Sequence, residues 1–355
     1  MSEGNLKVLL APGSRNRHVP ALSVALELRK RFHSVDLTWV GSGRGREKHL
    51  CRKYHITLFQ VNLDGRRKLS SFFGIIREFF RFNSFFRKER PSAVLSFGGY
   101  ESMPLLAAAR LRSIPYFLLE PNAVPDPVNR FFAGGAKKIF FGLTPVKSRV
   151  SGNSPEITGV PVLPLAKKYE HYQYPRKLDR AKKTILIIGS EEADNLGSFL
   201  INMVKIWADN GIQIVWKTGK GEYGLIRNRL RSCRNVLLFP TLKDPYPFYA
   251  VSRLVIGRST PLLLSEAAFF GLPCVLIPSI ESHIQWVNAG LVQNQGWAFR
   301  FTQENSSENM IIKSVQSIIN DQSVFESMSR KALDYSPFSA SSIITGKIVE
   351  ELGYK

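Results

Sequence analysis

A single carboxylate in an otherwise apolar helical segment is the most informative chemical feature of this sequence. The segment reads Ser265-Glu266-Ala267-Ala268-Phe269-Phe270-Gly271-Leu272-Pro273, and Gln285 and Asn288 follow it. The Gly-Leu-Pro turn ends the predicted helix, and an apolar run typical of a buried strand comes next. A carboxylate in such a helix can accept hydrogen bonds from both hydroxyls of a ribose. A solvated glutamate on a surface helix is the alternative interpretation.

Glycine-rich turns that follow predicted strands are the second chemical signal. Glycine lets the backbone approach a phosphate, and the N-terminus of a following helix favours its negative charge. None of these turns is a P-loop or a G-x-G-x-x-G fingerprint, and each alone also suits a tight strand-to-helix turn. Together they predict a ligand that carries phosphate. The turns are Pro12-Gly13-Ser14, Gly41-Ser42-Gly43, Phe97-Gly98-Gly99-Tyr100, Gly189-Ser190 and Thr218-Gly219-Lys220-Gly221.

The elements that must position these residues alternate between short apolar runs and amphipathic segments. Such βα alternation predicts parallel sheets with helices on both faces. A helix is expected over Ala21–Phe32. The predicted strands of the first half are Lys7–Ala11, Val35–Val40, Ala93–Phe97, Tyr116–Leu119 and Lys138–Phe141, and those of the second half are Thr184–Ile188, Gln213–Trp216, Val236–Phe239, Leu254–Ile256 and Cys274–Ile277.

The length of 355 residues and a break in this alternation predict two doubly wound domains. The expected boundaries are residues 1–163 for the first domain, 164–183 for a polar linker and 184–355 for the second domain. We also expect that the last helix, about residues 338–353, can pack back on the first domain. Ligands of such sheets bind beyond the carboxyl ends of the strands, so the site is expected in a cleft between the domains.

The net charge of +21 implies an anionic partner: nucleic acid, an acidic lipid or a phosphorylated substrate. The first 163 residues contain 26 Lys and Arg against 11 Asp and Glu, and therefore carry +15 of that charge. A genome-wide preference for Lys and Arg does not explain this asymmetry. Three widely spaced cysteines indicate no metal site and no disulfide framework, which favours a reducing cytoplasm. The short apolar run before Pro12 indicates neither a signal peptide nor a membrane span.

Residues 71–90, SFFGIIREFFRFNSFFRKER, combine seven phenylalanines with basic side chains. Phe72, Ile75, Ile76, Phe79, Phe82 and Phe86 can form one helical face toward a core. Phe73 and Phe80 would lie on another face with Arg77 and Arg81. This second face predicts binding to an anionic membrane surface. The alternatives are a helix that packs on two sides and stacking on single-stranded nucleic acid, and no nucleic-acid partner is expected.

In their order and spacing, these motifs resemble the MurG family of peptidoglycan N-acetylglucosaminyltransferases over nearly the whole chain. Leu242, Arg258, Glu266 and Gln285 fall within matching segments of the second half. The matching pieces are Val40-Gly41-Ser42-Gly43-Arg44-Gly45-Arg46-Glu47 (V-G-x-x-R-G-x-E), Phe97-Gly98-Gly99-Tyr100-Glu101-Ser102 (F-G-G-Y-x-S), Glu120-Pro121-Asn122-Ala123-Val124-Pro125 (E-Q-N-A-V-P), Thr158-Gly159-Val160-Pro161-Val162 (T-G-N-P-V), Thr218-Gly219, and Gln285 with Asn288-Ala289 (Q-x-x-N-A).

The resemblance implies a GT-B fold, in which two Rossmann-like domains face each other across a cleft. It also implies an inverting transfer of N-acetylglucosamine (GlcNAc) from UDP-GlcNAc to the muramyl 4-hydroxyl of lipid I, which gives lipid II. Lipid I is an undecaprenyl-diphosphate-linked muramyl pentapeptide. Such enzymes work at the cytoplasmic face of the plasma membrane, without a required metal or other cofactor. A related transferase with another lipid-linked acceptor, or a MurG-like scaffold protein that has lost catalysis, are the alternatives.

The roles of individual residues follow from the same resemblance. On the donor side, Glu266 would hold the ribose hydroxyls, Gln285 the GlcNAc hydroxyls and the backbone of Leu242 the uracil. The other donor-binding candidates are Ser190, Arg258 and Asn122. The acceptor-binding candidates are Ser14, Arg15, Arg17, Gly98, Gly99 and Tyr100, and the catalytic candidates are His18, Glu120 and Asn122. His18 is the candidate general base, with a surface histidine near a helix start as the alternative.

Three departures from the family pattern fall in loops that would handle phosphate. The family's G-G-T-G-G-H is here Pro12-Gly13-Ser14-Arg15-Asn16-Arg17-His18, so either Arg17 or His18 could replace the histidine. The family's G-G-S-Q-G-A is here Gly189-Ser190-Glu191-Glu192-Ala193-Asp194. Leu163 takes the place of an arginine. We therefore expect a rearranged diphosphate clamp.

Overall fold

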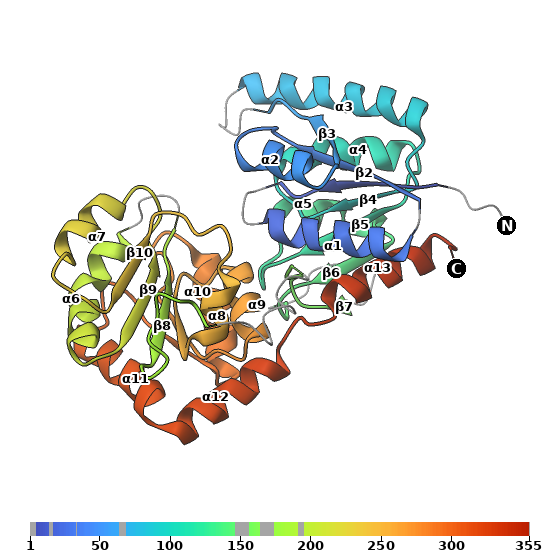
Figure 1. Ribbon diagram of the computed structural model, residues 1–355. Helices are drawn as coiled ribbons and strands as arrows, with labels where there is room; N and C mark the ends of the chain where they lie inside the picture. The colour runs from blue at the N-terminus through green and yellow to red at the C-terminus, as the bar shows by residue number, and fades with distance from the viewer. Residues whose placement is uncertain are drawn as a thin grey trace. The chain divides into compact units, whose positions relative to one another are not determined.

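The chain forms two compact units. The computed structural model describes residues 5–13, 17–32, 34–63, 69–145, 156–163, 174–190 and 195–354. Unit 1 comprises Met1–Leu163 and Phe338–Lys355, and unit 2 comprises Pro164–Pro337. Each unit is a parallel sheet with helices on both faces (Figure 1), so the prediction of two doubly wound α/β domains is confirmed.

Unit 1 contains sheet A, whose strand order is β3-β2-β1-β4-β5-β6-β7. All neighbouring strands are parallel. The sequence analysis missed β3 and β7, which are short and only partly buried. The strands are β1 (Leu6–Ala11), β2 (Val35–Gly41), β3 (Thr57–Gln60), β4 (Ala93–Ser96), β5 (Tyr116–Glu120), β6 (Lys138–Phe141) and β7 (Glu156–Ile157).

Two hydrophobic cores cover the two faces of sheet A because successive strand residues point to opposite sides. In β1, Leu6, Val8 and Leu10 face one core, while Leu9 and Ala11 face the other. The first core is closed by α1 (His18–Arg31), α2 (Arg46–Lys53) and α13 (Ala340–Glu351), and the second by α3 (Leu69–Glu89), α4 (Met103–Leu111) and α5 (Pro127–Phe132). Two short 3₁₀ helices, η2 (Tyr100–Ser102) and η3 (Ala133–Gly135), precede α4 and follow α5.

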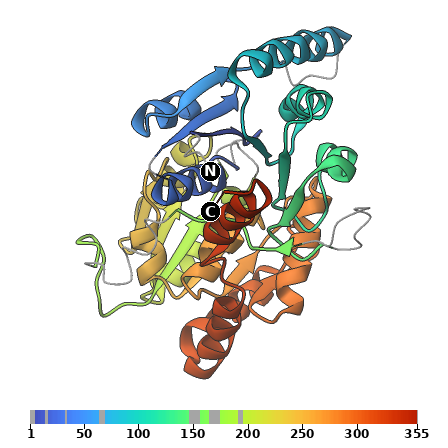
Figure 2. The same ribbon diagram turned by 90° about the vertical axis from the view of Figure 1, so that its right-hand side faces the viewer.

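The C-terminal helix α13 packs on α1 inside unit 1, although more than 300 residues separate the two helices in sequence. Ile344 and Ile348 are fully buried in the same core as α1. Ser23 Oγ lies 2.6 Å from Ser341 Oγ, and Arg31 Nη2 donates to the Ser342 carbonyl over 3.0 Å. Figures 1 and 2 both show α13, in red, beside α1, in blue. The last helix therefore completes unit 1.

Unit 2 contains sheet B, with the order β10-β9-β8-β11-β12-β13 and parallel neighbours throughout. The sequence analysis missed only the last of these strands, which has three residues. The strands are β8 (Thr184–Ile188), β9 (Gln213–Lys217), β10 (Val236–Phe239), β11 (Leu254–Gly257), β12 (Cys274–Leu276) and β13 (Ala298–Arg300).

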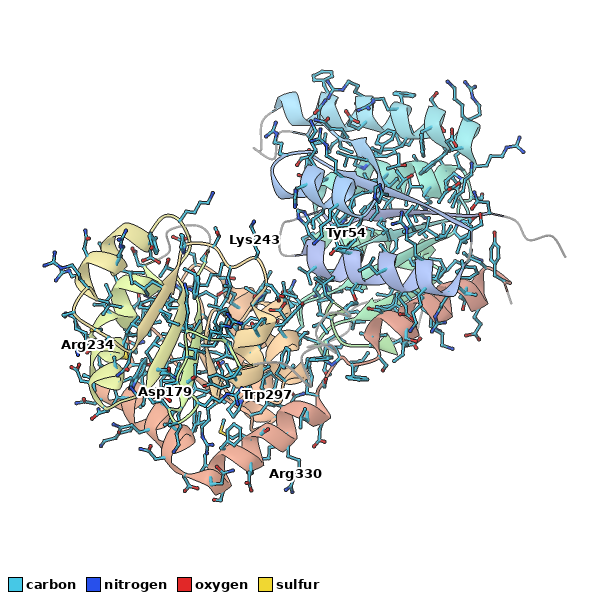
Figure 3. All side chains as sticks on the ribbon, viewed as in Figure 1. Tyr54, Asp179, Arg234, Lys243, Trp297 and Arg330 are labelled. Carbon is cyan, nitrogen blue, oxygen red and sulfur yellow. The ribbon has the colours of Figure 1, made fainter. Side chains whose placement is uncertain are left out.

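The helices of unit 2 bury large aromatic and aliphatic side chains against sheet B. Trp207, Trp216 and Trp297 are essentially inaccessible to solvent, and Figure 3 labels Trp297 inside unit 2. One core joins sheet B to helices α6, α7, α11 and α12. The helices are α6 (Leu196–Asp209), α7 (Tyr223–Arg229), α8 (Tyr246–Val251), α9 (Pro261–Phe269), α10 (His283–Asn294), α11 (Glu308–Asn320) and α12 (Gln322–Asp334).

Candidate functional site

Two glycine turns meet where sheet A changes its strand order, between β1 and β4. Gly13 has a φ of +73°, and a Cβ on it would lie 2.5 Å from the carbonyl oxygen of Gly98. Gly98 and Gly99 also have positive φ values, +80° and +88°. Only glycine suits such a backbone at such a close approach. Doubly wound sheets bind ligands at this switch point, so the predicted Gly98 and Gly99 lie where a ligand can bind.

Arg17 lies against the Gly98–Gly99 turn. Its Nη1 donates to the Phe97 carbonyl over 2.5 Å, and its Nη2 lies 3.3 Å from Asp126 Oδ2. These side chains are only 14% and 17% exposed, so the guanidinium is ordered before any ligand binds. Asp126 neutralises part of the charge of Arg17. The other two acceptor candidates of this loop, Ser14 and Arg15, lie outside the described residues.

Glu120 is fully buried and organises the loop that follows β5. Its Oε1 accepts from the backbone N–H and side-chain amide of Asn122, over 3.0 and 3.3 Å. Its Oε2 accepts from the Asp126 N–H over 2.7 Å and from Asn129 Nδ2 over 2.9 Å. Burial raises the pKa of Glu120, against these hydrogen bonds and the charge of Arg17, which lower it. With every partner a donor, this carboxylate positions Asn122 and has no free lone pair for a substrate proton.

His18 begins α1, and its imidazole is buried rather than presented to a ligand. The side chain is 4% exposed, its Nε2 lies 3.1 Å from Glu47 Oε1, and the ring packs edge-on against Trp39. Burial raises the pKa of Glu47, but hydrogen bonds from His18, Ser42 and Gly43 and the charge of His18 lower it. These contacts outweigh burial, so the pKa of Glu47 lies below its ordinary value. The other ring nitrogen, Nδ1, is buried and has no hydrogen-bond partner within the described residues, so burial shields it from a substrate hydroxyl.

Sheet B changes its strand order between β8 and β11, and here too glycine permits close contact. A Cβ on Gly189 would lie 2.9 Å from the carbonyl oxygens of both Lys217 and Thr218. Gly219 follows with a φ of +83°. Ser190, a donor-binding candidate, is half-buried next to this contact. Residues 191–194, where the sequence departs from the family, lie outside the described part of the chain.

Glu266 is buried in α9, which begins with Pro261 after the Thr260 N-cap. It is the sixth residue of that helix, between Ser265 and Ala267. The hydroxyl of Tyr249, from α8, is buried beside Glu266. Burial and the nearby charge of Glu266 raise the pKa of Tyr249 well above its ordinary value. A carboxylate this deep requires a polar partner, which excludes the interpretation of a solvated glutamate.

A hydrogen-bonded network holds the turn after β11 to the start of α10. Ser259 Oγ donates to the Gln285 carbonyl over 2.6 Å, and Asn288 Nδ2 donates to the Ser259 carbonyl over 3.3 Å. Gln285 Oε1 accepts from the Ser279 N–H over 2.9 Å. This bond orients the Gln285 side chain, whose Nε2 has no partner among the residues described and can donate to a sugar hydroxyl.

Arg258 and Leu242 complete the predicted donor residues. Arg258 is 4% exposed, and its Nη1 donates to the Ile277 carbonyl over 2.8 Å and to Gln303 Oε1 over 3.0 Å. It therefore fixes the turn after β11 from within unit 2. Leu242 lies half-buried in the loop that joins the carboxyl end of β10 to α8. Leu163, in place of the family's arginine, packs against the core of unit 1.

The sequence analysis did not single out several residues that hold these loops. Asp126 could have been found from the Asp-Pro pair that begins α5, where its side chain accepts from the Val128 N–H. Glu47 lies in a motif that was recognised without a role for its last residue. No sequence signal identifies Tyr249 or Ser259, because their neighbours come from distant segments.

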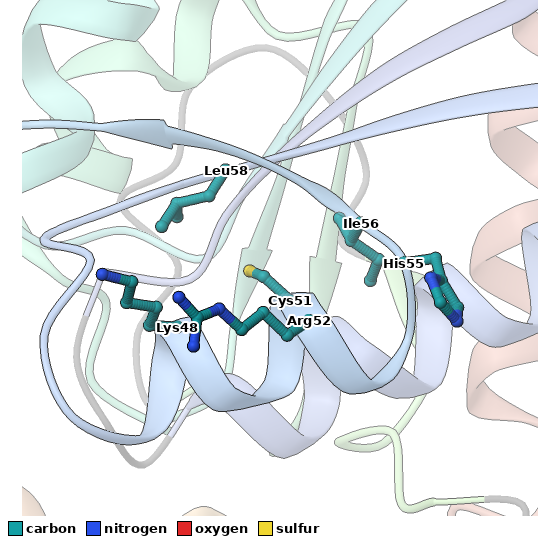
Figure 4. Close-up of a pocket in the computed structure, with 6 residues that line it drawn as sticks. All are labelled: Lys48, Cys51, Arg52, His55, Ile56 and Leu58. Carbon is teal, nitrogen blue, oxygen red and sulfur yellow. The ribbon is translucent and has the colours of Figure 1, made fainter.

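The described residues also form a hollow away from these turns. It has a volume of about 430 Å³ and lies over α2 and β3 (Figure 4). Its lining includes the basic side chains Lys48, Arg52 and His55 and contains none of the predicted site residues. Within the described ranges, no His, Cys, Asp and Glu side chains gather in a group that could hold a metal ion.

Comparisons with known proteins agree with the two-unit architecture. The glycosyltransferase family 28 N-terminal domain matches residues 8–141, and the family 28 C-terminal domain matches residues 184–343. The chain is 29% identical to the UDP-N-acetylglucosamine–N-acetylmuramyl-(pentapeptide) pyrophosphoryl-undecaprenol N-acetylglucosamine transferase of Natranaerobius thermophilus. That alignment covers 98% of this chain and 100% of the relative.

Solved structures show the same fold. The crystal structure of Acinetobacter baumannii MurG has a TM-score of 0.76 at 22% identity and covers 97% of this chain and 99% of that one. A UDP-GlcNAc 2-epimerase from Neisseria meningitidis, bound to UDP-GlcNAc, has a TM-score of 0.72 at 17% identity, with coverages of 97% and 100%. At these identities the likeness concerns the fold alone.

Two Rossmann-like units with glycine turns at their switch points, together with the domain matches, define a glycosyltransferase of the GT-B fold. The chain belongs to glycosyltransferase family 28, as a divergent member of the MurG family. The resemblance inferred from the sequence motifs is confirmed.

Proposed function

We propose that this enzyme transfers GlcNAc from UDP-GlcNAc to the muramyl 4-hydroxyl of lipid I, with inversion at the sugar carbon, in peptidoglycan synthesis. The observation that carries the proposal is the buried Glu266, in unbroken order with Arg258, Gln285 and Asn288. Curated relatives over 92–99% of the chain bear the name of this transferase. The proposal assigns UDP-GlcNAc to unit 2 and the lipid-linked acceptor to unit 1.

The donor-side roles follow from the geometry of unit 2. A buried carboxylate can accept both ribose hydroxyls, and hydrogen bonds to a charged acceptor are the stronger ones. The oriented amide of Gln285 suits the hydroxyls of GlcNAc. The Gly189 N–H is bound to the Lys217 carbonyl over 2.7 Å, but the turn that it forms with Ser190 lets the backbone approach a diphosphate, and the backbone of Leu242 can contact uracil. Arg258 acts by fixing the turn that follows β11.

The acceptor-side roles belong to the switch point of unit 1. The Gly98–Gly99 turn, with the ordered Arg17 against it, suits a diphosphate. Tyr100 is 37% exposed at the start of η2 and can line the muramyl site. Asn122 is held by Glu120 at the end of β5. Ser14 and Arg15 extend the same loop in sequence.

The direct test is incubation of the purified protein with UDP-GlcNAc and a lipid I analogue, with UDP release and product mass as readouts. We expect one equivalent of UDP for each GlcNAc-extended product. Tight binding of UDP-GlcNAc without turnover on several lipid-linked acceptors would instead indicate a scaffold protein. Turnover on a different polyprenyl-diphosphate sugar would indicate a related transferase. A protein that binds no uridine nucleotide would contradict every donor-side role.

We further propose that α3 binds an anionic membrane surface and places the enzyme at the cytoplasmic face of the plasma membrane. Phe73 and Phe80 are 69% and 61% exposed, one above the other along the helix. Between them, the buried Glu78 pairs with Arg77 over 3.1 Å and with Arg81 over 2.5 Å. Phe82 and Phe86 are buried, as expected, whereas Ile76 is 37% exposed, so it belongs to the outer face rather than to the predicted core face. Within the described residues, the helices are too short or too polar to cross a bilayer.

Replacing both Phe73 and Phe80 by serine should reduce flotation with liposomes that contain anionic lipid. The two exposed rings bury apolar area in the interface, and the arginines beside them add electrostatic attraction. Flotation should also weaken as salt rises. Phe131→Ser is a matched control because Phe131 is 71% exposed in the same unit but lies on α5. Equal flotation of the double variant and the wild type would contradict this role of α3.

A further inference from the structure

Four carboxylates of the described residues lie at or after the carboxyl ends of β2, β4 and β5. Three of them already form hydrogen bonds or ion pairs with other residues. Glu47 bonds His18, Ser42 and Gly43. Glu120 accepts from four donors. Asp126 caps α5 and pairs with Arg17. Hydrogen bonds or ion pairs therefore engage both oxygens of each of these three carboxylates.

The fourth carboxylate, Glu101, has no hydrogen bond or ion pair within the described residues. It is half-buried in η2, directly after the Gly98–Gly99 turn. The Ser102 Oγ donates to the Gly99 carbonyl over 2.7 Å and closes this short helix, which fixes the backbone that carries Glu101. A half-buried carboxylate without a partner loses part of its hydration, and no hydrogen bond or ion pair compensates for that loss. Such a position favours a functional role.

The other candidate bases at this edge are excluded by their surroundings. The imidazole of His18 is enclosed by Glu47 and Trp39. The guanidinium of Arg17 has hydrogen-bond donors only and no acceptor for a proton. Glu120 acts through Asn122 and Asn129 rather than on a substrate. An inverting displacement nevertheless requires a group that accepts the proton of the attacking hydroxyl.

We propose that Glu101 is the general base of the transfer reaction, an inference that rests on the proposed function. The carboxylate takes the proton of the acceptor hydroxyl while that oxygen forms its bond to the anomeric carbon of GlcNAc. The bond from this carbon to the UDP oxygen breaks in the same step, and its electron pair leaves with UDP. Glu101 then returns the proton to solvent, so that charge and protons balance over the cycle.

The electrostatic surroundings of Glu101 suit a base that is stronger than an ordinary carboxylate. Burial, and then the charge of Glu47, raise the pKa of Glu101, whereas Arg44 lowers it. Glu47 and Arg44 both lie after β2, and His18 of α1 pairs with Glu47. Arg17 and Asp126 neutralise each other beside the glycine turn. Since the base must be ionised, kcat/KM should fall as pH decreases through the raised pKa of Glu101.

The test compares Glu101→Gln, Glu101→Asp and Arg44→Gln with the wild type in the lipid I assay. We expect Glu101→Gln to lower kcat by about 10²-fold or more, the range that general base catalysis contributes, with KM for UDP-GlcNAc unchanged. Glu101→Asp should retain part of the activity. Arg44→Gln removes a charge that lowers the pKa of Glu101, so it should move the acid limb of the pH profile to higher pH. Glu350→Gln, an exposed glutamate of α13, is the control.

The outcomes separate this inference from the function on which it rests. An active wild type with an equally active Glu101→Gln overturns the role of Glu101 alone. A loss of activity that raises KM for the acceptor but leaves kcat and the acid limb unchanged shows a binding residue and also overturns it. A wild type that binds UDP-GlcNAc but transfers nothing overturns the proposed function and the base together. Thermal unfolding of Glu101→Gln at the wild-type temperature shows that unit 1 of the variant is folded, and unchanged binding of UDP-GlcNAc shows the same for unit 2.

Discussion

Glu266→Ala should weaken the binding of UDP-GlcNAc by roughly 10- to 150-fold. Hydrogen bonds to a charged group contribute about 1.5–3 kcal/mol, and every 1.4 kcal/mol or so is a factor of ten in affinity. The carboxylate is 7% exposed and lies beside the buried Tyr249 hydroxyl, so water replaces it poorly. The same loss should appear in kcat/KM for the donor, because the ribose contact is made in both the ground state and the transition state.

Isothermal titration with UDP and with UDP-GlcNAc is the measurement for Glu266→Ala. Both ligands carry the ribose, so both should lose a similar factor, which distinguishes a ribose contact from a contact with GlcNAc. Gln285→Ala should by contrast weaken UDP-GlcNAc more than UDP. The exposed Glu326 of α12 provides the control variant Glu326→Ala. If Glu266→Ala bound both nucleotides as tightly as the wild type, the ribose assignment would be wrong.

Glu120→Gln should disorder the loop after β5 and, as a result, lower the rate of GlcNAc transfer. In the wild type, donors face both carboxylate oxygens of Glu120. Glutamine replaces one of these oxygens by an NH₂ group, which leaves at least one buried donor unsatisfied at a cost of about 1–3 kcal/mol. The backbone N–H groups of Asn122 and Asp126 both donate to Glu120. Asn122 then loses its position, and a misplacement of ~1 Å near the reaction centre can lower a rate by about 10²-fold.

Hydrogen exchange resolves this effect of Glu120→Gln at the level of peptides. The amides of Asn122 and Asp126 should exchange faster, while those of sheet B should be unchanged, because unit 2 has its own core. Glu89→Gln is a suitable control, since Glu89 is exposed and its one ion pair, with Lys7, lies at the surface of unit 1. Unaltered exchange in residues 121–129 would show that Glu120 does not organise this loop.

Much of the fold could be predicted from the sequence because it depends on local patterns. Apolar runs of three to six residues indicated ten of the strands with boundaries within a residue or two. The strands β3 and β7, which escaped, contain polar residues, and each is an edge strand of sheet A that pairs with a single neighbour. The helix α1 begins three residues earlier than expected, since Pro20 fits in the first turn of a helix.

The candidate site was predictable only in part. Glu266, Gln285 and the Gly98–Gly99 turn could be proposed from the sequence because their neighbours in sequence carry the signal. The proposed base Glu101 could not, because the choice between it, His18 and Arg17 depends on which side chain is enclosed by its neighbours. Trp39 and Glu47, which enclose His18, come from β2 and α2.

The sequence by itself determined the class of fold, the family and the order of the glycine turns and polar residues along the chain. Period, spacing and residue type are properties of a linear chain, and they specify which elements form. Only the tertiary structure decided which polar groups are already satisfied, because hydrogen bonds join residues that lie far apart in sequence. It assigned Glu120 to its loop and Arg17 to Asp126, and it left Glu101 at the switch point without a partner among the described residues.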